Sequence, residues 1–120
     1  MLDNRARIWE NTYMDKKTLK KMFKYINREL FDNELDMPVF FFIPKNQEVY
    51  PFEIDGYCLG SDRQYIVGLS EGLTTQNYFD TLAHEMMHMH LIETKGYEGH
   101  GKPFLKLCEK GIDTFYWSIL

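Results

Sequence analysis

Apolar residues recur at helical spacing near the start of the chain and predict a first helix from Lys16 to Phe31. Asp15 precedes this helix as the expected N-cap, and the polar run at 32–36 ends it. Residues 1–14 form a polar lead-in. The apolar stripe that should face the core consists of Leu19, Met22, Phe23, Ile26 and Leu30.

Three strands are predicted after this helix. Residues 37–43 are dense in β-branched and aromatic side chains, which is typical of a buried strand, and Pro44 closes it. Residues 44–54 are expected to form a loop. Two further strands at 56–59 and 65–70 flank residues 60–63, whose composition suits a hairpin turn.

Two more helices are predicted in the second half of the chain. The first covers residues 76–93 with Thr74 or Thr75 as N-cap. Its core stripe should be Phe79, Leu82, Ala83, Met86, Met87 and Leu91.

The last helix should begin near Pro103 and end at Gly111. Its buried residues should be Phe104, Leu107 and Cys108. Residues 115–117 then predict a short final strand or an aromatic plug made of Phe115, Tyr116 and Trp117.

This order of elements predicts one α+β domain over residues 1–120, because no repeat, linker or low-complexity segment divides it. We expect a short antiparallel sheet packed on the 76–93 helix, with an N-terminal helix before it and a closing C-terminal helix after it. The strand at 65–70 is expected to form the sheet edge nearest that helix. An extended polypeptide can add to such an edge through backbone hydrogen bonds.

Composition adds a charge asymmetry. The net charge of −4 argues against a generally basic surface, yet residues 1–28 hold eight Lys or Arg against three Asp or Glu. On the outer face of the first helix these bases are Lys16, Lys17, Lys20, Lys21, Lys24 and Arg28. The face is expected to be either a solvated helix surface or a contact for DNA phosphates.

The two cysteines, Cys58 and Cys108, cannot form a four-cysteine zinc site and are expected to be free thiols. No apolar leader follows Met1, and no run approaches about 18 apolar residues, so neither a signal peptide nor a membrane span is predicted. We therefore expect a protein of the cytoplasm, nucleoid or nucleus, without membrane contact.

The 76–93 helix carries the sequence His84-Glu85-Met86-Met87-His88, which matches the zinc-hydrolase motif HExxH. Residues four apart lie on one helix face, so both imidazoles can reach one metal ion. Zinc lowers the pKa of water from 15.7 to roughly 7, and a neighbouring carboxylate can take the proton. Glu85 is therefore the candidate general base.

A catalytic zinc site usually needs a third protein ligand. The metzincin spacing would place that histidine at Thr94, which excludes this class. His100, between Gly99 and Gly101, is favoured over Glu109 because glycines permit the sharp turn that would bring it back. His90 cannot share the metal face and is expected beside the site or on the surface.

These residues resemble the SprT-like domain family, in which LxHExxHxxL is followed by a loop and a GHGxxF segment. Residues 82–91 match the first motif, residues 99–104 match the second, and the resemblance covers roughly residues 15–117. It implies a zincin-like metalloprotease that holds one Zn²⁺ with His84, His88 and His100 and uses Glu85 as base. A Cys-rich zinc ribbon, which many relatives carry, is not encoded in this chain.

The predicted activity is hydrolysis of peptide bonds in protein or peptide substrates, including DNA-bound or DNA-crosslinked proteins. Tyr97 and Tyr116 are candidate donors to the oxyanion. One alternative is a non-catalytic zinc-containing interaction module. Another is a metal-dependent nuclease, which Glu85 disfavours because the similar YbeY-type nucleases have glycine at that position. The oligomeric state is not predicted.

Overall fold

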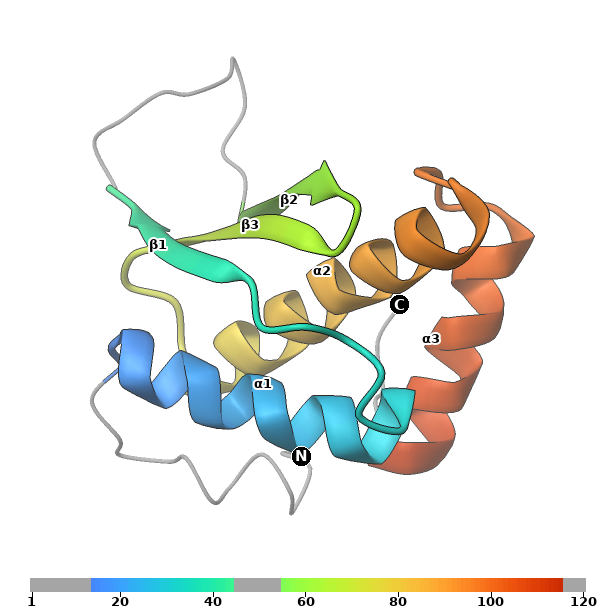
Figure 1. Cartoon of the computed structure of the whole chain (residues 1–120). Coiled ribbons are helices and arrows are strands. Elements are labelled where there is room, and N and C mark those ends of the chain that lie inside the picture. Colours follow the sequence, from blue (N-terminus) through green and yellow to red (C-terminus); the bar gives the residue numbers. More distant parts are fainter. Residues whose placement is uncertain (1–13, 45–54, 116–120) are drawn as a thin grey trace.

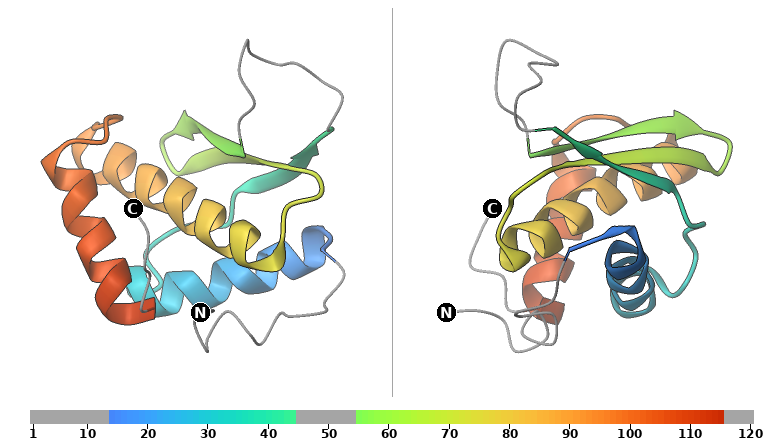
Figure 2. Two further views of the ribbon diagram at one scale, coloured as in Figure 1. Left: turned by 180° about the vertical axis from the view of Figure 1, so that it is seen from behind. Right: turned by 90° about the vertical axis from the view of Figure 1, so that its left-hand side faces the viewer.

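A computed structural model describes residues 14–44 and 55–115, which form three helices and one three-stranded sheet (Figure 1). The elements follow the order α1, β1, β2, β3, α2, α3. All three helices lie on one side of the sheet (Figure 2). This is an α+β arrangement, as the sequence predicts. The predicted lead-in and the expected roles of Tyr116 and Trp117 fall outside the described residues, as does most of the predicted loop at 44–54.

Helix α1 has the predicted bounds, Lys16–Phe31, and the predicted cap. The Asp15 carboxylate accepts a hydrogen bond from the Thr18 backbone N–H at 2.8 Å, which satisfies one of the unpaired donors of the first turn. Asp32 follows in the left-handed conformation and ends the helix. The whole predicted apolar stripe is buried: Leu19, Met22, Phe23, Ile26 and Leu30.

The sheet is mixed, so the expected all-antiparallel sheet is wrong. Strands β2 (Gly56–Ser61) and β3 (Gln64–Ser70) form an antiparallel hairpin, whereas β1 (Val39–Ile43) runs parallel to β3. The hairpin follows from a tight turn in which Asp62 and Arg63 both have positive φ, at 51° and 65°. The longer connection between β1 and β2 lets β1 pair with the far side of β3.

The strand order is β1-β3-β2, which makes β3 the central strand. The predicted sheet edge at residues 65–70 is therefore wrong, because both sides of β3 are already hydrogen-bonded. The two edges belong to β1 and β2. Of these, β2 lies along α2, where a Cβ on Gly56 would come within 2.8 Å of Thr81 Cγ2.

Helix α2 (Thr75–Lys95) begins at Thr74, whose hydroxyl accepts a hydrogen bond from the Asn77 N–H at 3.1 Å. The six residues of its predicted core stripe are all buried. Met89 and Tyr78 are buried as well, so α2 is enclosed over more of its circumference than the sequence indicated. Gly96, with φ 60°, ends the helix.

Helix α3 (Lys102–Phe115) does not end at Gly111, as the sequence predicted, but continues for another turn. A glycine inside a helix costs about 1 kcal/mol. The extra turn buries Phe115 completely, and its ring packs on Phe79 with centroids 5.2 Å apart. Phe115 thus acts as an aromatic plug but within a helix, and the alternative of a final strand is wrong for this residue.

Candidate metal centre

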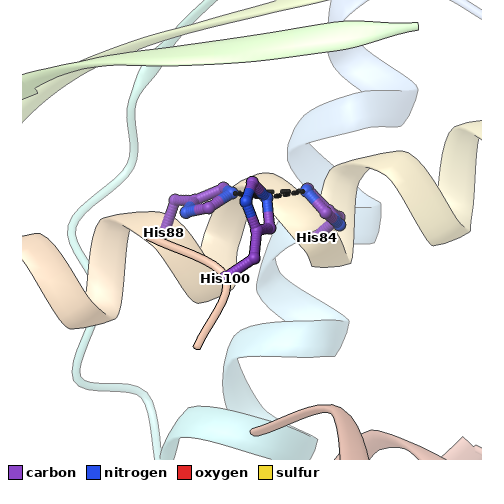
Figure 3. Close-up of side chains that lie close together, drawn as sticks. All are labelled: His84, His88 and His100. Carbon is purple, nitrogen blue, oxygen red and sulfur yellow. Dashed lines mark hydrogen bonds between the residues drawn. The ribbon is translucent and has the colours of Figure 1, made fainter. Parts of the chain in front are cut away.

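Helix α2 presents His84 and His88 on one face, one turn apart. Its other faces carry the buried stripe that packs into the core, so the two imidazoles stay at the surface of the helix layer and are half-buried. Their Nε2 atoms lie 3.2 Å apart. Figure 3 shows both rings pointing toward a common region beside the helix.

His100 reaches the same region from the turn between α2 and α3 (Figure 3). The chain reverses at Gly96, whose N–H donates to the Ile92 carbonyl at 3.0 Å. The His100 Nε2 atom then lies 3.1 Å from that of His88 and 3.4 Å from that of His84. The sequence predicted this grouping of three histidines.

The spacing of the three nitrogens fits a tetrahedral ion. Their ligand atoms all lie within 4.8 Å of one another. A zinc ion with bonds of about 2.0–2.1 Å needs nitrogens about 3.3–3.4 Å apart, close to the separations here. A neutral imidazole offers only one donor and one acceptor, so three ring nitrogens converging on one point suit a shared cation better than mutual hydrogen bonds.

Burial also favours the unprotonated forms of His84 and His88, which metal binding requires. Burial lowers the pKa of His88 to about 4, with further lowering by the neighbouring charges of His84 and His100. Burial likewise lowers the pKa of His84, and His100 adds to the effect. The three histidines therefore lie close enough to bind a metal ion.

Phe104, on the first turn of α3, supports all three rings from the core side. Its ring centroid lies 4.8 Å from the centroid of each imidazole, and the ring stacks on His88 at an interplanar angle of 29°. Phe104 is 4% exposed. The sequence predicted only its burial. The GHGxxF segment, which contains both His100 and Phe104, was the available signal for this contact.

Glu85 is the buried acid of the group, at 6% exposure. Burial raises the pKa of its carboxyl group to about 7. Burial is the cause of this shift, and no hydrogen bond contributes to it. Burial raises the pKa of the Cys58 thiol on β2 to about 12, and the nearby charge of Glu85 raises it as well. The Glu85 carboxyl group therefore lies near Cys58 of the edge strand β2.

The other candidate residues lie elsewhere. Glu109 is exposed on α3 and is not part of the histidine group. His90 is half-buried and its ring packs on Phe31 with centroids 5.4 Å apart, away from that group. Cys58 and Cys108 are free thiols, as expected.

The β2–β3 hairpin is hydrogen-bonded to the end of α2, which the sequence did not predict. The Tyr65 hydroxyl donates to the Glu93 carboxylate at 2.6 Å, and the Arg63 backbone N–H donates to the same oxygen at 3.0 Å. Arg63 also pairs with Asp36 at 2.7 Å. These bonds hold Arg63 in its left-handed conformation, which a non-glycine residue seldom adopts.

The model of the SprT-like family matches residues 19–115, which includes all of the described histidine group. Comparison with curated proteins returned no match. None of the helices in the described residues is long and apolar enough to cross a membrane.

Proposed function

Because this chain belongs to the SprT-like family, we propose that it is a zinc-dependent endopeptidase. The observation that carries the proposal is the group of three imidazoles converging within 3.1–3.4 Å, with the buried carboxylate of Glu85 next in sequence to one of them. A purely structural zinc site has no use for such a carboxylate.

In this proposal His84, His88 and His100 hold one Zn²⁺. When bound, the ion supplies Lewis acidity, which polarises a carbonyl group and acidifies water. Glu85 accepts the proton from the attacking water and passes it to the leaving amine. Its burial suits this role because a pKa near neutrality lets one carboxyl group both take and return a proton. A nearby cation would favour the ionised form that starts the cycle.

The substrate would lie along β2, and not along the strand at residues 65–70 that the sequence analysis favoured. This strand pairs only with β3 among the described residues, so its outer edge can accept an extended peptide backbone. The position is supported by Cys58 of β2, which lies near Glu85. Leu59 is 57% exposed on the same strand and would favour apolar substrate side chains next to it.

We further propose that DNA-bound proteins are one substrate class. The support is the outer face of α1, where all six basic side chains are exposed: Lys16, Lys17, Lys20, Lys21, Lys24 and Arg28. At about 100° per residue they fall within an arc of about 140°, so one run of phosphates could face them all. Lys20→Glu combined with Lys24→Glu should remove any stimulation of cleavage by single-stranded DNA.

The test incubates zinc-loaded protein with a DNA-bound protein, with and without single-stranded DNA, beside Glu85→Gln. We expect the variant to keep its fold and zinc and to lose about 10²–10⁴-fold in the rate of protein cleavage. Glu109→Gln is the matched control and should cleave normally, because Glu109 is exposed and away from the histidines.

The same gel separates the alternatives. Unchanged cleavage by Glu85→Gln would remove this residue from the mechanism. DNA fragments in place of protein fragments would identify a nuclease. A zinc-loaded protein that cleaves neither would be an interaction module.

A further inference from the structure

The turn that carries His100 is wrapped around the phenol of Tyr97. The Tyr97 hydroxyl accepts a hydrogen bond from the Gly101 backbone N–H at 2.6 Å. Gly101 directly precedes α3, and its carbonyl accepts the Leu105 N–H at 3.0 Å, as a helix-capping residue does. The phenol therefore links the start of the turn to the start of α3, with His100 between the two ends.

The two glycines beside His100 are needed for space, and not for backbone conformation. Among the three glycines of this turn only Gly96 has a positive φ, so the expected reason for Gly99 and Gly101 is wrong. A Cβ on Gly101 would collide with the Tyr97 hydroxyl oxygen, and the next nearest atom, Tyr97 Cζ, would be 3.7 Å away. A Cβ on Gly99 would lie 2.8 Å from the hydroxyl oxygen and 3.0 Å from Cζ.

We propose that Tyr97 is a positioning residue for His100, which acts by fixing the turn and makes no contact with the metal itself. The inference rests on the proposed metal centre. The Tyr97 ring packs against the hydrophobic core, so it cannot swing away freely when the turn changes. Its hydroxyl accepts the Gly101 N–H, which is a structural bond within this turn.

The geometry gives different expectations for the two glycines. Tyr97→Phe removes the hydrogen bond that fixes the turn and should weaken zinc binding about 10-fold, the lower end of the effect seen when groups that orient a metal ligand are changed. Gly101→Ala should weaken zinc binding further, because the new methyl group would collide with the Tyr97 hydroxyl and displace the turn. When Tyr97 is phenylalanine, the nearest atom to the same methyl group is Cζ, at 3.7 Å. Tyr97→Phe should therefore restore part of the zinc affinity that Gly101→Ala loses.

Gly99→Ala is the matched control. Its methyl group would still lie 3.0 Å from Cζ after the hydroxyl is removed, so Tyr97→Phe should not rescue this substitution. The readout is the zinc dissociation constant, obtained by competition with a chromophoric chelator. The absorption spectrum of the Co²⁺-loaded protein reports the ligand geometry independently, and circular dichroism reports the fold.

The proposal is supported if Gly101→Ala binds zinc more weakly than the double variant Gly101→Ala/Tyr97→Phe, while the Gly99 pair shows no such recovery. Additive effects at Gly101, or wild-type zinc affinity and Co²⁺ spectrum in Tyr97→Phe, would overturn it. Tyr97→Phe alone decides the matter should the alanine variants fail to fold. A wild-type protein that binds no zinc would instead refute the metal centre of the proposed function, and this inference would fall with it.

Discussion

Glu85→Gln should stabilise the metal-free protein, and the gain should grow with pH. In the absence of a cation Glu85 is only 6% exposed, so ionising its carboxyl group is costly. Burial raises its pKa from 4.5 to about 7. Glutamine has a similar shape and no charge, so it avoids this cost.

The direction of the pH dependence follows from proton binding. Between about pH 4.5 and pH 7 the folded chain keeps a proton on Glu85 that the unfolded chain has released, so the wild-type protein loses stability as pH rises through this window. Raising the pKa from 4.5 to about 7 corresponds to about 3 kcal/mol when complete, at about 1.4 kcal/mol per tenfold change in proton affinity. Glutamine at position 85 does not ionise, so Glu85→Gln does not lose this stability as the pH rises.

The assay is urea denaturation in the presence of a chelator, followed by circular dichroism, for wild type and Glu85→Gln. The difference in unfolding free energy should increase by about 2–3 kcal/mol between about pH 5 and pH 8, a relative shift of about 1–2 M in urea midpoint. His84 and His88 are present in both proteins, so their own titration cancels in the difference. Glu109→Gln, which changes an exposed glutamate in the same way, is the matched control. A Glu85→Gln difference that does not change with pH would refute the desolvated carboxylate.

Two other substitutions test the site and the core. His100→Ala should lower the zinc content well below one ion per chain, whereas Glu109→Ala should leave it unchanged, as measured by metal analysis of dialysed protein; the reverse result would assign the third ligand to Glu109. Phe79→Ala should cost about 3–5 kcal/mol of unfolding free energy in urea, because the ring is fully buried against Phe115. A cost below about 1 kcal/mol would contradict that packing.

The parts of this fold that follow from neighbouring residues could be predicted from the sequence. The bounds and cap of α1 depend on a stripe and a carboxylate within a few positions of one another, and both are confirmed. The same holds for His84 and His88, which one helical turn brings together. His100 joins them across twelve residues, and there the motif resemblance supplied what local spacing alone could not.

Pairing over longer distances could not be predicted in this way. A strand's own residues do not show which neighbours it will have, so the position of β1 on the far side of β3 was missed, and with it the identity of the free edge. The end of α3 was missed because the burial of Phe115 outweighs the weak helix propensity of Gly111. The contact of Tyr97 with Gly101 lies in an irregular turn, where no periodic pattern marks it.

The contact of one phenylalanine ring with three imidazoles limits how the site can be redesigned. Exchanging any one histidine for aspartate or cysteine would change a donor atom and also remove an aromatic neighbour of Phe104, leaving a gap at the top of the core. Attempts to retune metal preference one ligand at a time should therefore begin by choosing a new side chain for position 104.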